Sequence, residues 1–187
     1  MIITISGKPC CGKSTMAEIF CKKYNFERIY AGAIFKEEAR KLGLNVKELS
    51  LSQKYFDIDY KVDEYLKNIY NSRVDENILI ESRPAFSFMP NAFNVFIDVD
   101  DNTMATRLFN SDRTGKESVN SLQQALNECT TRYQADCDKY KKLYNVDCDD
   151  MSNYNYVINN SNLTPEQTAD KIYEQYLKFC NNKNLSN

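Results

Sequence analysis

Residues 7–14 read Gly-Lys-Pro-Cys-Cys-Gly-Lys-Ser and follow directly after an apolar run at residues 2–5. In this G-x-x-x-x-G-K-S pattern, the glycines let the backbone turn its N–H groups inward around a polyphosphate. The pattern lies between a predicted buried strand and a helix start, and a helix N-terminus favours anions. Only five glycines occur in the chain, and Gly7 and Gly12 occupy the two positions that the pattern needs. The sequence therefore predicts a loop that binds the phosphates of a nucleoside triphosphate.

The lysine and the serine of this loop have separate predicted roles. Lys13 is expected to reach the β- and γ-phosphates of ATP, and the Ser14 hydroxyl to ligate Mg²⁺. The expected ATP contacts are Gly7, Lys8, Pro9, Cys10, Cys11, Gly12, Lys13, Ser14 and Thr15. We interpret the two cysteines as replacements for small loop residues, with the alternative that their oxidation blocks nucleotide binding.

The composition limits the other classes of function. A chain of 187 residues with 42% hydrophobic residues suffices for one domain with a core. A net charge of −2 without a long basic run argues against a nucleic-acid partner. The absence of histidine excludes histidine-based zinc sites and bases, and seven cysteines without paired spacing indicate reduced thiols. Neither a signal peptide nor a membrane helix is predicted. We expect a cytoplasmic monomer that acts on small nucleotides, without a membrane partner.

Strand and helix patterns alternate along the chain, which predicts an α/β fold with a parallel sheet flanked by helices. The expected strands cover residues 2–6, 28–31, 77–81, 94–99 and 156–159. The expected helices cover residues 13–24, 34–42, 46–51, 58–72, 101–110 and 118–144, with a last helix that opens at a capping box from Thr164 to Gln167. A polar break at residues 112–116 precedes the longest helix. Residues 1–180 are predicted to form a single domain and residues 181–187 a polar tail.

Several arginines follow the predicted strands, where ligands of open parallel sheets bind. Phosphoryl transfer needs cations around the migrating group, and the arginine fork holds phosphate oxygens in pairs. The candidates are Arg40, Arg83, Arg107, Arg113 and Arg132. Glu81 ends an otherwise apolar strand. We interpret it either as an outer partner of Mg²⁺ or as half of a buried ion pair with Arg83.

Taken in order, these features resemble the nucleoside monophosphate kinases, and most closely the archaeal-type cytidylate kinases. The matching blocks are the phosphate loop, Ala31-Gly32-x-Ile34-Phe35 with Arg40, Asp57-Ile58-Asp59 with Asp63, Glu81-x-Arg83, Arg107 with Arg113, Arg132, Tyr144-x-Val146-Asp147 with Asp150, and Tyr154-x-x-Val157-Ile158-Asn159. The resemblance implies a three-layer P-loop NTPase fold with a five-stranded parallel sheet, a helical monophosphate-binding segment and a helical lid over about residues 107–132. It also implies transfer of the γ-phosphoryl group of ATP to CMP or dCMP, which gives the diphosphate and ADP.

The resemblance assigns roles to the charged residues. Arg40, Asp59 and Arg83 are expected to bind the acceptor, beside the Mg²⁺ site already expected at Ser14 and Glu81 from the loop pattern and the strand end. The catalytic cations are expected to be Lys13, Arg107, Arg113 and Arg132.

The chain also departs from the family pattern. Ala33 and Asn155 replace acidic residues, Ser82 replaces a glycine, and Asp138 with Lys139 stands where lid arginines are usual. The departures leave two alternatives open. One is a kinase for AMP, UMP or a small hydroxylated metabolite, and the other is a non-catalytic nucleotide-binding module derived from such a kinase.

Overall fold

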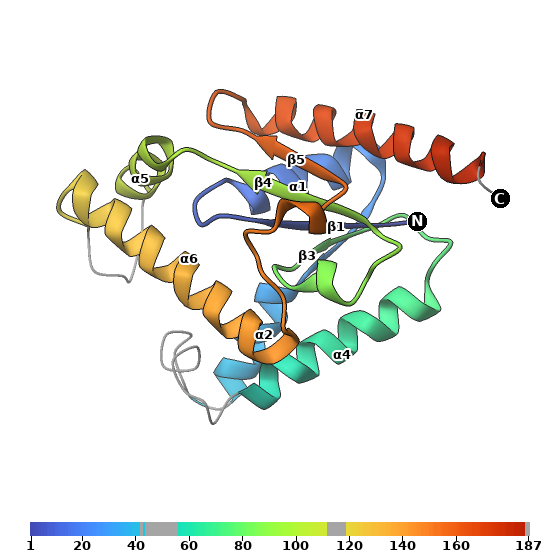
Figure 1. The fold of residues 1–187 in the computed structure, drawn as a ribbon, viewed down its shortest axis with the longest axis horizontal. Coiled ribbons are helices and arrows are strands. Elements are labelled where there is room, and N and C mark those ends of the chain that lie inside the picture. The colour runs from blue at the N-terminus through green and yellow to red at the C-terminus, as the bar shows by residue number, and fades with distance from the viewer. Residues whose placement is uncertain (42, 44–55, 112–118, 186–187) are drawn as a thin grey trace.

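A computed structural model describes residues 1–41, 43, 56–111 and 119–185 of the protein. Five strands form one parallel sheet in the order β2-β3-β1-β4-β5 (Figure 1). They are β1 (Ile2–Gly7), β2 (Glu27–Tyr30), β3 (Ile78–Glu81), β4 (Phe93–Asp98) and β5 (Tyr156–Asn159). The expected parallel α/β fold with five strands is therefore confirmed, and each strand begins and ends within one residue of its predicted range.

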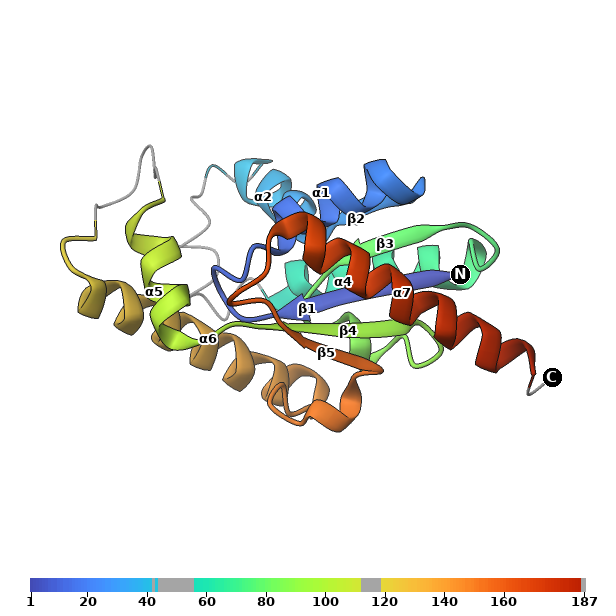
Figure 2. The same ribbon diagram turned by 90° about the horizontal axis from the view of Figure 1, so that it is seen from above.

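The helices cover both faces of the sheet and its carboxyl edge. They are α1 (Lys13–Tyr24), α2 (Ala31–Lys41), α4 (Phe56–Ser72), α5 (Asp101–Phe109), α6 (Leu122–Tyr144) and α7 (Pro165–Asn184), with short 3₁₀ turns at Ala85–Ser87 and Met151–Asn153. Figures 1 and 2 show α1 and α7 on one face and α4 on the other, with α5 and α6 beyond the carboxyl ends of the strands. No helix in the described ranges has the length and apolar character needed to cross a bilayer.

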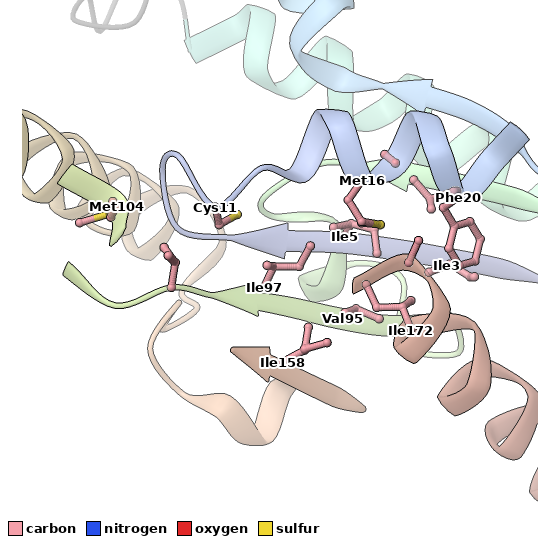
Figure 3. Packing of buried hydrophobic residues seen from close by; sticks show 14 of the residues in the cluster. Ile3, Ile5, Cys11, Met16, Phe20, Val95, Ile97, Met104, Ile158 and Ile172 are labelled. Carbon is pink, nitrogen blue, oxygen red and sulfur yellow. The ribbon is translucent and has the colours of Figure 1, made fainter. Parts of the chain in front are cut away.

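The central strand β1 is buried along its whole length because helices cover both of its sides. On the first side, Ile3 and Ile5 pack with Met16 and Phe20 of α1 and with Ile172 of α7 (Figure 3). On the opposite side, a second cluster joins the sheet to α4 and consists mainly of Ile2, Ile78, Ile80, Val62, Leu66 and Ile69. The two clusters make the sheet a rigid platform for the loops at its carboxyl edge.

Some helix ends differ from their predicted positions. Ser121 caps α6 by accepting a hydrogen bond from the Gln124 N–H, so this helix begins four residues later than expected. The last helix has the predicted capping box but continues through residues 181–184, which we expected in the polar tail, because no glycine or proline ends it there. The predicted helix at 46–51 and the polar break at 112–116 lie outside the described residues.

Candidate active site

The phosphate loop connects β1 to α1 at the carboxyl edge of the sheet. Gly7 has φ +146° and Gly12 has φ +80°, values that glycine adopts without strain. A Cβ atom on Gly7 would lie 2.3 Å from the carbonyl oxygen of Ile97 in β4. The Lys8 N–H donates to the same oxygen at 3.2 Å. The loop therefore packs directly on β4, and only glycine permits that close approach.

The start of α1 offers unused hydrogen-bond donors. Its N-cap is Gly12, which has no side chain to occupy the N–H groups of the first turn, and that turn contains no acidic residue. Free N–H groups and the positive end of the helix dipole attract anions. Ser14 and Thr15 in this turn are exposed. The loop and the helix start together form an anion site open to solvent.

Lys13 reaches across the loop from the first turn of α1. Its Nζ donates to the carbonyl oxygens of Gly7 at 2.8 Å and Lys8 at 2.9 Å and lies 3.4 Å from Cys11 Sγ. Burial lowers the pKa of this ammonium, and the nearby guanidinium of Arg83 adds to that, whereas Cys11 and Glu81 oppose it. The ammonium is therefore held by loop carbonyls at the place where phosphate oxygens would meet it.

Glu81 lies at the end of β3, and each of its two carboxylate oxygens accepts a hydrogen bond from a different residue. Ser14 Oγ donates to Oε1 at 2.6 Å, and Arg28 Nη2 donates to Oε2 at 2.6 Å. The Glu81 residue is only 4% exposed. The alternative that Glu81 pairs with Arg83 is wrong: the register of β2 beside β3 places the Arg28 strand against Glu81, and Arg83 turns toward α6.

The Ser14–Glu81 pair fits Mg²⁺ in its chemistry. Hydroxyl and carboxylate oxygens are the hard ligands that this ion prefers, and Mg²⁺ usually takes only one or two ligands from protein, with phosphates and water supplying the rest. Across the residues that the structure describes, no group of three or more Asp, Glu, Cys or His side chains could hold a metal ion. Ser14 and Glu81 thus suit an ion that arrives with a nucleotide.

Arg83 follows β3 and forms an ion pair across the site. Its guanidinium donates to Asp136 of α6, and both side chains are mostly buried, with 22% and 18% of their surface exposed. Its Nε is buried and has no hydrogen-bond partner within the described part of the chain. Ser6 Oγ donates to the Arg83 carbonyl at 2.8 Å and holds the backbone beside the phosphate loop. A guanidinium in this position has donors left for an anion.

Two carboxylates of α4 face α6 beside this pair. Lys139 Nζ lies 3.2 Å from Asp59, and the Tyr144 hydroxyl donates to Asp63. Burial raises the pKa of Asp59, and Lys139 opposes that rise. Burial also raises the pKa of Asp63 to about 6, against the hydrogen bond from Tyr144. Arg83, Asp59 and Asp63 thus lie along one contact surface between α4, β3 and α6, which we call the α6 face.

Arg107 of α5 is joined to the phosphate loop through one residue. It donates to the side-chain and backbone oxygens of Asn160, both at 3.0 Å. The Asn160 amide, 4% exposed, donates in turn to the Cys11 carbonyl at 2.6 Å. These hydrogen bonds place Arg107 beside the loop, next to the residue that follows β5.

The remaining predicted site residues are exposed, pair with carboxylates, or lie outside the described residues. Arg132 is an exposed residue of α6. Arg40 is 78% exposed at its side chain and pairs with Glu37 of its own helix. Lys8 pairs with Asp98 at 2.7 Å. Arg113 is outside the described residues. The acceptor and lid roles of these arginines stay predictions.

Sequence reasoning missed three residues of the site. They are Arg28, Asp136 and Asn160. A signal existed only for Asn160, which follows the last predicted strand and so had to reach the carboxyl edge. In the sequence, nothing distinguishes Arg28 and Asp136 from the ordinary charged residues of a strand and a helix. The substituted Asn155 has a structural role, because its amide oxygen accepts from the Asn94 N–H at 2.7 Å.

A phosphate loop after the central strand of a sheet ordered β2-β3-β1-β4-β5 defines a P-loop kinase fold. The shikimate kinase of Bacteroides thetaiotaomicron shares this fold, with a TM-score of 0.62 at 18% identity over 93% of this chain and 97% of that one.

The sequence comparisons are more specific. A family model described as AAA domain matches residues 3–152. The cytidylate kinase of Sulfurisphaera tokodaii is 32% identical over 186 residues, covering 99% of both chains. That of Methanosarcina mazei is 32% identical over 171 residues, covering 91% of this chain and 93% of the relative. The chain therefore belongs to the cytidylate kinase family of P-loop proteins with this AAA domain, and it is a nucleoside monophosphate kinase.

Proposed function

We propose that the protein transfers the γ-phosphoryl group of ATP to CMP or dCMP and releases the nucleoside diphosphate and ADP. The observation that carries this proposal is the similarity to cytidylate kinases over the whole chain, with the phosphate loop intact. The names of those relatives supply the acceptor base, and the residues of the site supply the argument for the transfer.

The loop side is proposed to hold the donor. The N–H groups of the loop and of the first turn of α1 bind the phosphates, and Lys13 moves its ammonium from loop carbonyls to phosphate oxygens. Ser14 and Glu81 would hold Mg²⁺, which neutralises phosphate charge when it is bound. Burial of Glu81 and its contact with Arg28 keep its carboxylate oriented toward Ser14.

The α6 face is proposed to hold the acceptor. Arg83 binds the acceptor phosphate with donors that the pair with Asp136 leaves unused, and Arg40 and Asp59 complete the acceptor site. An oxygen of the acceptor phosphate attacks the γ-phosphorus while the bond to ADP breaks. No general base is needed, because the attacking oxygen is already anionic. Arg107, Arg113 and Arg132 supply positive charge to the migrating group.

A coupled assay of ADP release tests the proposal with CMP, dCMP, UMP, AMP and GMP at matched concentrations with Mg²⁺ and ATP. We expect turnover with CMP or dCMP well above turnover with the other three. Preferential turnover with AMP or UMP would overturn the acceptor and keep the mechanism. ATP binding without turnover on any acceptor would overturn the proposal in favour of a non-catalytic module.

A further inference from the structure

The phosphate loop and α6 meet through two cysteines that are 119 residues apart in the sequence. The Sγ atoms of Cys10 and Cys129 lie 3.7 Å apart. Cys10 has a left-handed backbone with φ 55°, and its half-buried side chain packs against the same core cluster that contains Cys129. Cys129 is 2% exposed. The two sulfurs are in van der Waals contact, and a disulfide bond of about 2.05 Å requires a shift of less than ~2 Å.

The adjacent thiol of Cys11 has different surroundings. Its side chain is fully buried among the apolar residues shown in Figure 3, and its sulfur lies 3.4 Å from Lys13 Nζ. The two neighbouring cysteines of the loop are therefore not equivalent. Only Cys10 combines partial exposure to solvent with a thiol of α6 in contact.

We propose that Cys10 and Cys129 form a redox-modification site in which a peroxide joins the phosphate loop to α6. Peroxide first oxidises the half-exposed Cys10 thiol to a sulfenic acid and releases one water. The Cys129 thiol then attacks that sulfur, so that the S–S bond forms, the S–O bond breaks and a second water leaves. The two thiols give up two electrons and two hydrogens in total, and a dithiol reductant reverses the reaction.

The bond would act on the kinase through α6, a consequence that rests on the proposed function. Arg132 lies one helical turn beyond Cys129, and Asp136, the partner of Arg83, lies one turn further. Arg132 is exposed and must approach the phosphates to take its proposed role. A disulfide bond one helical turn away from Arg132 would hold α6 at a fixed distance from the phosphate loop. Displacement of catalytic groups by about 1 Å can lower a rate about 100-fold, so we expect a loss of that order.

A second pair of cysteines in α6 and the segment after it provides an internal comparison. Cys137 and Cys148 belong to one buried cluster with Tyr140 and are 9% and 5% exposed. Burial raises the pKa of both thiols, which keeps them protonated and unreactive. Two thiols thus lie close together in both pairs, but only in the Cys10–Cys129 pair is one thiol partly exposed to solvent.

The experiment treats the reduced full-length protein with hydrogen peroxide, blocks the remaining thiols by alkylation, and maps the peptides by mass spectrometry. We expect a Cys10–Cys129 peptide, loss of the mass of two hydrogen atoms, and slower formation of the link when Mg²⁺ and ATP are present. Turnover should fall about 100-fold and return with a dithiol reductant. Cys10→Ser and Cys129→Ala should each abolish the link and the sensitivity. Cys180→Ser, at a half-buried thiol of α7 outside the site, should change neither.

Other outcomes would overturn the inference. A Cys137–Cys148 or Cys10–Cys11 link, or an oxidised Cys10 beside an alkylated Cys129, contradicts the site itself. A complete Cys10–Cys129 link with unchanged turnover contradicts its effect on the kinase. The link in a protein whose reduced form transfers no phosphate would support the site and overturn the proposed function. If Cys129→Ala fails to fold, the test remains decisive, because Cys10→Ser removes the other thiol of the pair at a half-buried position of the loop.

Discussion

The phosphate loop and the α6 face border the same site, but different kinds of contact hold them in place. The loop is built from backbone groups that are close in sequence. The Lys13 ammonium donates hydrogen bonds to carbonyl oxygens five and six residues before it. The close approach of Gly7 to Ile97 fixes the loop on β4. This half of the site depends on a few residues with special backbone requirements and on the sheet beneath them.

The α6 face is built from side-chain pairs between elements that are distant in sequence. Arg83 and Asp136 are 53 residues apart, Asp59 and Lys139 are 80 apart, and Asp63 and Tyr144 are 81 apart. Each pair forms only when α6 is positioned correctly relative to β3 and α4. The comparison suggests that substitutions in the loop act on the chemistry directly, whereas substitutions on the α6 face act on binding and on stability together.

The largest effect is expected from Lys13→Ala. The variant removes the ammonium beside the loop carbonyls, and loss of one such preorganised charge lowers kcat by about 10²–10³-fold. Measurement of kcat with saturating ATP and CMP checks this, with urea unfolding to confirm that the fold persists. Lys22→Ala, at an exposed position of the same helix, is the matched control and should keep wild-type turnover. Wild-type turnover in Lys13→Ala would contradict the direct role of the loop.

Arg83→Ala tests whether the α6 face binds the acceptor. Loss of the guanidinium should lower kcat/KM for CMP by about 10²-fold, since a charged pair with phosphate is lost, and leave the KM for ATP within a few-fold. Asp136→Asn separates binding from structure, because it breaks the same ion pair but keeps the arginine. A purely structural role of Arg83 predicts equal losses in the two variants. We expect a clearly smaller loss in Asp136→Asn.

A pH-dependent stability is expected from Asp63 on the α6 face. Its pKa of about 6, raised by burial from 3.8, means that the folded state holds the proton more tightly than the unfolded state. This contribution to the free energy of unfolding is therefore complete below about pH 4 and is lost as the pH rises through about 6. The difference corresponds to about 2–3 kcal/mol.

Urea unfolding at about pH 4 and about pH 8 measures this contribution as the difference between the wild type and Asp63→Asn. The variant has no carboxylate to ionise, so the decline of stability toward high pH should be smaller by about 2 kcal/mol. Asp75→Asn removes an exposed carboxylate before β3 and controls for the change in net charge. Identical pH dependence in the wild type and Asp63→Asn would show that Asp63 is not desolvated.

The smallest effect is expected from Asn160→Ala beside the loop. The variant leaves the Cys11 carbonyl and the Arg107 guanidinium without this amide, and loss of such buried hydrogen bonds costs about 1–2 kcal/mol of unfolding free energy. Asn162→Ala, at an exposed position two residues further along the same loop, is the control. Denaturant titration of both variants measures the difference. Equal stabilities would show that loop geometry does not depend on the α5 side.

The sequence alone determined the sheet, the loop and the class of protein. The alternation of strand and helix patterns predicted all five strands within one residue. The signal is clearest for β1, β3 and β4, because a strand covered on both faces is largely apolar along its length. The spacing of Gly7, Gly12 and Lys13 predicted the loop, because its requirements on the backbone are local. The order of short blocks along the chain was enough to indicate the kinase family.

Only the tertiary structure decided which charges meet. The pairing of Glu81 with Arg28 follows from strand register, and the pairing of Arg83 with Asp136 follows from the position of α6. The contact between Cys10 and Cys129 has the same origin. The positions of charged side chains and thiols in the sequence follow no periodic pattern from which their partners could be predicted. Each pair depends on how elements that are distant in sequence pack together. The backbone of the site is thus a local property of the sequence, and its electrostatics and its thiol contact are properties of the folded chain.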